Sequence, residues 1–201
     1  MSAPFRLRCR RIQVTYTERN WVAEGNSNTA PEGGYAHQAS TAANPAIDTY
    51  TNVASSGANV AELTARAAAV DSLLVSGGTN ILSVLIAVNI GSWMTDFAAY
   101  LDARRANGWY IILCMPIPAD PGTGYEANRQ TALTELRQWA TSGSTVPGKH
   151  ADVICDFAAH AAFDGDDAGD TNYFSDGVHL TVLGHTTLLS IFQPVLDASR
   201  L

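Results

Sequence analysis

The chain has 201 residues and a formal net charge of −7, which disfavours nucleic-acid binding because proteins that bind nucleic acids carry a basic face. Hydrophobic residues make up 46% of it and charged residues 15%, so we expect one folded domain with its own core rather than a disordered segment. No run approaches the roughly 18 apolar residues of a membrane span, and no apolar segment follows the N-terminal arginines. We therefore expect a soluble protein with no membrane partner and no signal peptide.

The three cysteines, Cys9, Cys114 and Cys155, are widely spaced. They form neither the C-x-x-C pair of a zinc or redox site nor the even set of a disulfide scaffold. Cys114 and Cys155 lie in apolar runs, which predicts that both are small core residues.

Residues 1–20 are interpreted as an N-terminal arm. Apolar and polar residues alternate over 5–16, and the phase slips by one at Arg10 and Arg11, which predicts two strand pieces joined by a bulge or a turn. The arm would either edge the sheet or contact a partner chain, which would make a homo-oligomer through this arm. Its arginines are better explained as a solvated strand face than as a site for an anionic partner.

From residue 21 onward, short apolar runs alternate with amphipathic segments. We predict strands over 21–24, 46–53, 81–88, 109–115 and 151–157, and helices over 35–43, 59–69, 92–107, 125–140 and 181–199. The near-continuous apolar run 81–88 is typical of a central parallel strand that is covered on both faces. This order predicts a three-layer α/β/α sandwich around a mainly parallel, five-stranded sheet, in which ligands bind beyond the carboxyl ends of the strands.

Three candidate residues follow predicted strands at that edge. Ser27 lies in a sharp strand-to-helix turn, where the N–H groups of the next helix start would also point; capping of that helix is the competing explanation. Gly57 lies in a strand-to-helix loop, where its N–H could approach a ligand or simply serve a turn. Asn89 ends a buried strand, and its amide either donates into the crevice or is satisfied by loop backbone.

Asp176 precedes His179 by three residues in a turn that contains Gly177 and leads into the last helix. Residues three apart on one turn face the same way, so the carboxylate can hold the imidazole and leave its other nitrogen free as a base. Such a pair needs a nucleophile, and Ser27 is the candidate. The competing explanation is a helix-initiating Asp beside a surface His.

The long segment 158–174 is rich in aspartate and would line the same edge. It partly resembles a calcium loop but lacks the closing Glu, so we favour a solvated loop and expect no metal site. Its aspartates are Asp164, Asp166, Asp167 and Asp170.

Taken together, these blocks resemble the SGNH (GDSL-type) hydrolase family from about residue 21 to the C-terminus. The turn 25–29 is similar to its first block, Gly57 and Asn89 to its second and third, and 176–181 to its last. The resemblance implies an esterase that acts on short acyl groups, with acetylated carbohydrate favoured, and needs no cofactor. It implies a triad of Ser27, His179 and Asp176, and an oxyanion hole made by Ser27, Gly57 and Asn89.

Three positions depart from the family pattern. Asn26 stands where the first block usually has Asp, and in the third block Ala87 and Ile90 replace Gly and Asp. These departures and the N-terminal arm support an alternative from another class. It is a catalytically silent relative that serves as a carbohydrate-binding or particle-associated module.

Overall fold

The computed structural model of the chain describes residues 17–42, 47–86, 93–119, 125–141, 148–165 and 167–199. Most of the expected arm lies outside these residues, so its strand pieces and its contact with a second copy stay predictions. Asn89, Ala87 and Ile90 also lie outside them.

Five strands of the described residues form one sheet in the order β2-β1-β3-β4-β5, and all four neighbouring pairs are parallel. The strands are β1 (Arg19–Gly25), β2 (Thr49–Asn52), β3 (Thr79–Leu85), β4 (Tyr110–Cys114) and β5 (Val153–Cys155). The helices are α1 (Tyr35–Thr41), α2 (Val60–Asp71), α3 (Trp93–Ala106), α4 (Tyr125–Leu136) and α5 (Val182–Ala198). The predicted three-layer α/β/α fold is confirmed.

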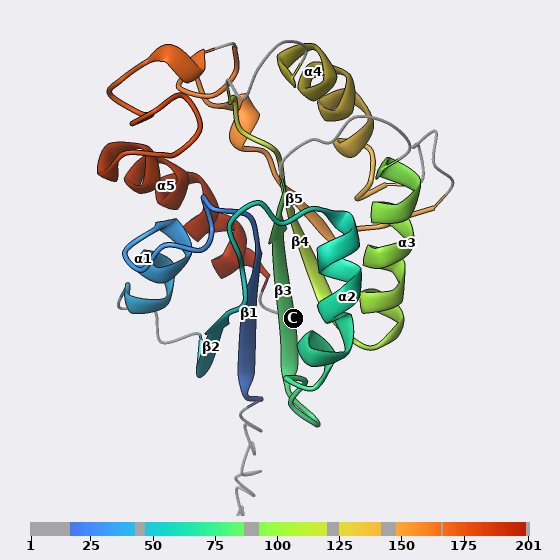
Figure 1. The fold of residues 1–201 in the computed structure, drawn as a ribbon. Helices are drawn as coiled ribbons and strands as arrows, with labels where there is room; N and C mark the ends of the chain where they lie inside the picture. The colour runs from blue at the N-terminus through green and yellow to red at the C-terminus, as the bar shows by residue number, and fades with distance from the viewer. Residues whose placement is uncertain are drawn as a thin grey trace, which may run out of the picture.

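The helices cover the two faces of the sheet in separate groups (Figure 1). α1 and α5 pack on one face, where the core includes Trp21 of β1 and Phe192 of α5. α2, α3 and α4 pack on the other face, around Val22 and Trp139. Successive residues of β1 therefore bury their side chains in different cores, because strand side chains alternate between the faces of a sheet.

Several element ends differ from the sequence predictions. β1 starts at Arg19, and β3 spans Thr79–Leu85 where 81–88 was expected. α4 ends at Leu136, four residues early, although Trp139 beyond it is fully buried. The capping box of Asn59 and Glu62 is present at the start of α2, and Cys114 and Cys155 are buried on adjacent strands as predicted.

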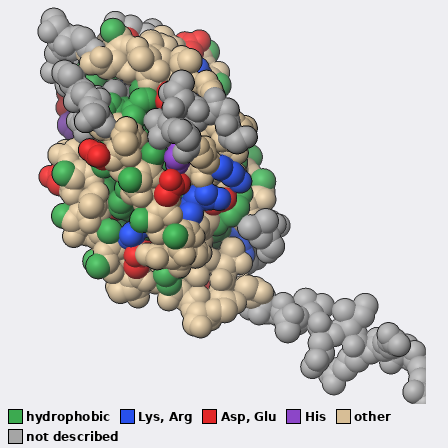
Figure 2. All heavy atoms as spheres, turned by 90° about the vertical axis from the view of Figure 1, so that its right-hand side faces the viewer, with side chains coloured by type: hydrophobic (Ala, Val, Ile, Leu, Met, Phe, Trp, Pro, Cys, Tyr) green, Lys and Arg blue, Asp and Glu red, His purple; other side chains and the backbone are tan. Residues whose placement is uncertain are grey.

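Acidic and basic side chains lie next to each other on the side of the molecule that carries α2 and α3 (Figure 2). Arg104 of α3 pairs with Asp71 of α2 at 2.9 Å, and Arg105 pairs with Asp152 at 3.2 Å, next to β5. These ion pairs join the helices of this face to each other and to the sheet. Among the described helices, none is both long enough and apolar enough to cross a membrane.

Candidate active site

The turn that carries Ser27 begins where β1 ends against β3. Gly25 has φ +152°, and a Cβ there would lie 2.2 Å from the carbonyl oxygen of Leu85, so the close approach of the two strands requires glycine. The N–H of Asn26 donates to that same oxygen at 3.0 Å. The Asn26 side-chain oxygen accepts the N–H of Asn28 at 3.0 Å, which closes a tight turn around Ser27.

The helix that follows this turn starts later than expected. α1 begins at Tyr35, and the first N–H of this helix donates to Nδ1 of His185 at 3.4 Å. We expected the N–H groups at the start of this helix to point at Ser27. For the N–H of Tyr35 this expectation is wrong, because it donates to His185 instead. Ser27 is half-buried, and the residues after it are held by their own turn.

Gly57 lies in the loop between β2 and α2. It has φ +73°, a left-handed conformation that favours glycine, and a Cβ there would meet no atom within 4 Å. The loop is fixed to the nucleophile turn, because the N–H of Ser55 donates to the carbonyl of Gly25 at 3.0 Å. Within the described parts of the chain, neither the Ser27 N–H nor the Gly57 N–H donates to a protein acceptor.

Asp176 and His179 are in direct contact. The carboxylate oxygen Oδ2 lies 2.7 Å from Nδ1 of the imidazole, and Oδ1 accepts the backbone N–H of His179 at 2.7 Å. The hydrogen bond from the His179 side chain, with the backbone hydrogen bonds, lowers the pKa of Asp176 to about 2. An ionised carboxylate only accepts, so Nδ1 carries the proton and Nε2 keeps the lone pair of a base.

Asn28 joins the histidine turn to the nucleophile turn. Its Nδ2 donates to the carbonyl of Val178 at 3.0 Å, and its Oδ1 accepts the N–H of Leu180 at 3.1 Å. The two bonds therefore bracket His179 in the chain, and Asn28 is itself the neighbour of Ser27. Sequence reasoning placed Asn28 in the first block without a role. The signal available was an amide directly beside a candidate nucleophile.

Ser27, Gly57 and Val178 line one cavity of about 150 Å³ at the carboxyl ends of the strands. Its other walls are largely apolar and come from five separate segments. They are formed by Asn26, Asn28, Ala58, Ile86, Ile117, Ala119 and Tyr125. The structure thus brings the first, second and last sequence blocks together, whereas Asn89 of the third lies outside the described residues.

The hydroxyl of Ser27 makes no hydrogen bond to His179 or to any other residue that the structure describes. Hydrogen bonds between a nucleophile and its base are often long before a substrate is bound. The turns that carry the two residues nevertheless touch through Asn28.

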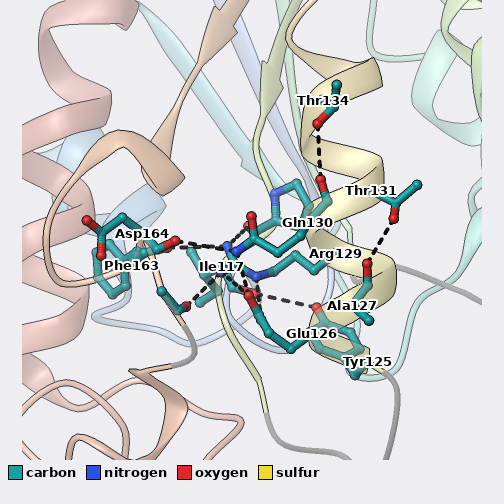
Figure 3. Close-up of polar contacts among 12 residues, drawn as sticks. Ile117, Tyr125, Glu126, Ala127, Arg129, Gln130, Thr131, Thr134, Phe163 and Asp164 are labelled. Carbon is teal, nitrogen blue, oxygen red and sulfur yellow. Dashed lines mark hydrogen bonds and ion pairs between the residues drawn. The ribbon is translucent and has the colours of Figure 1, made fainter.

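Arg129 of α4 is the centre of a group of polar contacts with its own helix and with residues around Ile117 and Phe163 (Figure 3). Its guanidinium is fully buried and forms two hydrogen bonds with Glu126, at 2.7 and 2.6 Å. It also donates to the carbonyls of Pro116, Phe163 and Gly165 at 3.3, 3.2 and 2.8 Å. One side chain thus ties the loop after β4 to the acidic segment 158–174. Arginine is mostly exposed in folded proteins, so its position in a predicted helix did not indicate this role.

Glu24, near the end of β1, belongs to a buried polar network next to the site. It is fully buried, and its carboxylate receives a hydrogen bond from Tyr100 and pairs with Arg66 at 2.8 Å. Burial raises the pKa of Glu24, and the hydrogen bonds from Tyr100 and Arg66 oppose that rise. Arg66 also donates to the hydroxyl of Ser55 at 2.6 Å, so this network connects the end of β1 to the loop of Gly57.

Neither a model of a protein family nor a curated protein sequence matches this chain. Solved structures match it closely in shape. A member of the lipolytic G-D-S-L family from Veillonella parvula has a TM-score of 0.67 and 14% identity, over 91% of this chain and 100% of that one. A catalytic mutant of an acetylxylan esterase from Geobacillus stearothermophilus has a TM-score of 0.61 and 16% identity, over 92% and 96%.

A GDSL-like lipase from Bacteroides thetaiotaomicron agrees equally well, with a TM-score of 0.67 and 15% identity over 90% of this chain and 88% of that one. The chain has the GDSL-type hydrolase fold. At such low identities the likeness establishes this fold, while activity has to be argued from the side chains of the site.

Ser27 and Gly57 lie beyond the carboxyl ends of β1 and β2, the edge where open α/β sheets bind ligands. In the described residues, no three His, Cys, Asp or Glu side chains gather in a way that could hold a metal ion.

Proposed function

We propose that the protein is a serine esterase that hydrolyses short-chain acyl esters, with Ser27 as nucleophile, His179 as base and Asp176 as the group that orients the base. The observation that supports this most is the contact between the Asp176 carboxylate and Nδ1 of His179, on a turn joined to that of Ser27. Among the residues that line the cavity, Ser27 has an aliphatic hydroxyl and lies on a turn that is hydrogen-bonded to the turn of His179.

The reaction runs through an acyl-enzyme. Ser27 Oγ attacks the ester carbonyl while Nε2 of His179 takes the hydroxyl proton and then passes it to the leaving alcohol. Water then attacks the acyl carbonyl, His179 again takes a proton, and the carboxylic acid leaves as Ser27 regains its hydrogen. The oxyanion would be held by the N–H groups of Ser27 and Gly57 and by the amide of Asn89.

The size of the cavity supports a short acyl group. Sites for drug-sized ligands usually measure about 300–1,000 Å³, and the cavity beside Ser27 has about 150 Å³. Its apolar side chains, such as Ile117 and Val178, suit an acetyl or another short alkyl group. We propose an acetylated carbohydrate as the substrate class, by analogy with the acetylxylan esterase of the same fold.

Hydrolysis of p-nitrophenyl acetate by the wild type and by Ser27→Ala tests the proposal. Loss of the nucleophile should lower kcat by up to about 10⁶, the loss in the subtilisin series. Asn89→Ala should cost only about 10²–10³, as removal of one oxyanion donor does in subtilisin. Acetate esters should be cleaved faster than octanoate esters, since the cavity is small.

The second candidate is a catalytically silent carbohydrate-binding or particle-associated module. Two observations favour it: Asn26 replaces the usual Asp, and the Ser27 hydroxyl does not bond His179 among the described residues. Equal and slow turnover by the wild type and Ser27→Ala would support this candidate and reject the esterase.

A further inference from the structure

We infer that Asn28 is the positioning residue that sets His179 against Ser27, an inference that rests on the proposed esterase function. Asn28 is buried, with 4% of its surface exposed. Both functional atoms of its amide are used on the backbone that flanks His179, the Val178 carbonyl at 3.0 Å and the Leu180 N–H at 3.1 Å.

The other hydrogen bonds of the turn that carries His179 lie within the turn. Asp176 Oδ1 accepts the N–H groups of Val178 and His179 at 3.0 and 2.7 Å. Ser175 donates to the carbonyl of His179 through both its N–H, at 2.8 Å, and its hydroxyl, at 3.0 Å. Apart from the two bonds with Asn28, every hydrogen bond that the structure describes for residues 175–180 stays within that segment.

This segment is also exposed to solvent. About half of the His179 side chain and half of the Asp176 side chain are accessible. Local bonds keep the carboxylate on the imidazole, but they cannot fix where that pair lies relative to the rest of the molecule. Buried packing of Leu180 anchors one end of the turn, and Asn28 supplies the polar attachment next to the base.

The other end of this attachment is equally well defined. The N–H of Asn28 donates to the side-chain oxygen of Asn26, whose own N–H is bonded to β3 at Leu85. Ser27 lies between these two asparagines in the turn. The hydrogen-bonded connection between the turn of Ser27 and the turn of His179 therefore runs through the Asn28 amide. A shift of this amide would change the distance between the two turns, and with it the distance between Ser27 and His179.

The size of the effect follows from the geometry of general-base catalysis. A misplacement of about 1 Å in a reacting group can cost about 10²-fold in rate. We therefore expect Asn28→Ala to lower kcat on p-nitrophenyl acetate by about 10²-fold while KM stays near the wild-type value. Because Asn28 carries no charge, the pH of half-maximal activity should stay unchanged.

Asn28→Asp keeps the size of the side chain and the acceptor for Leu180, but it places a second acceptor against the Val178 carbonyl, which repels it. It should lower kcat at least as much as Asn28→Ala, and it gives a second test of the same contact. The matched control is Asn52→Ala. The Asn52 amide holds the carbonyl of Thr29 at 3.0 Å on the same nucleophile turn, without contacting 178–180.

Amide hydrogen exchange supplies a readout that does not depend on catalysis. The Leu180 N–H should exchange faster in Asn28→Ala than in the wild type, and it should be unchanged in Asn52→Ala. A kcat within about threefold of the wild type in both Asn28 variants would overturn the inference, as would an equal loss in Asn52→Ala. A wild type without esterase activity would instead reject the proposed function, and this inference with it.

Discussion

The carboxylate of Asp176 contacts His179 twice, at the imidazole Nδ1 through Oδ2 and at the backbone N–H through Oδ1, both at 2.7 Å. Spacing by three residues makes this possible, since one carboxylate can then reach the ring and the main chain of the same residue. The ring is thereby fixed in both orientation and tautomer before any substrate arrives.

Replacement of Asp176 by Asn should lower kcat, because the amide can donate to Nδ1 and favour the wrong tautomer. The corresponding change in a buried triad costs about 10⁴-fold. We expect a smaller loss here, since more than half of the Asp176 side chain is exposed and water can partly replace the carboxylate. Steady-state kinetics on p-nitrophenyl acetate would measure it, and an unchanged kcat would contradict the role.

The same pair predicts the pH dependence of the wild type. The hydrogen bond from His179 holds the pKa of Asp176 at about 2, so this carboxylate stays ionised at all pH values above its titration. The profile of kcat/KM should therefore show no step from Asp176 at the pH where an ordinary aspartate titrates, near pH 4. A step there would show that another carboxyl group takes part.

Gly57→Ala should reduce activity more than stability. The substitution puts a side chain at φ +73°, which costs about 1 kcal/mol, but nothing lies within 4 Å of the added Cβ. The loop should relax and turn its N–H away, so kcat should fall by up to about 10²-fold. Gly77→Ala is the matched control, because Gly77 has φ +75° and equally open space at the opposite end of the sheet. Equal kinetics for the two variants would exclude an oxyanion role for Gly57.

Arg129→Lys should destabilise the protein by about 3 kcal/mol, because a lysine cannot reproduce the planar fork that serves Glu126 and three carbonyls. Urea unfolding monitored by circular dichroism would measure the loss. Arg137→Ala provides the comparison, since Arg137 pairs with Asp156 in a more exposed position and should contribute at most about 1 kcal/mol. An equally small loss of stability in Arg129→Lys would mean that the loop after β4 and the segment 163–165 do not depend on Arg129.

His185 predicts how stability changes with pH. Burial lowers the pKa of His185, whose Nδ1 accepts the N–H of Tyr35. A histidine with a lowered pKa is neutral in both states above its unfolded pKa, and as the pH falls below that value the unfolded state binds the proton first. The free energy of unfolding should therefore decrease on acidification from neutral pH. His185→Gln should weaken that dependence, and an identical pH slope in both proteins would refute this account.

The alternation of apolar runs was sufficient to predict the layers and the parallel sheet, since buried parallel strands need continuous apolar residues. The same pattern did not predict where individual strands and helices end. The run 81–88 continues past Leu85, where β3 ends, because burial alone extends to Ile86 without strand hydrogen bonding. Likewise Trp139 is buried beyond the end of α4, so apolar spacing overestimated the length of that helix.

The site could be predicted where the interacting residues are close in sequence, and not where they are far apart in sequence. The contact of Asp176 with His179 follows from a spacing of three, and it is present. The contacts of Asn28 with 178–180 and of Arg129 with 163–165 join segments far apart in sequence, which no local pattern specifies. The departure at Asn26 has a simple structural reason, because its amide oxygen accepts the N–H of Asn28 as a carboxylate would.

Reaction with a fluorophosphonate probe, followed by mass spectrometry of the labelled peptide, tests the central assignment most directly. The esterase account predicts one covalent adduct on Ser27 that is absent in Ser27→Ala and formed far more slowly in His179→Gln. An adduct on a different residue, or none on the folded wild type, would contradict it.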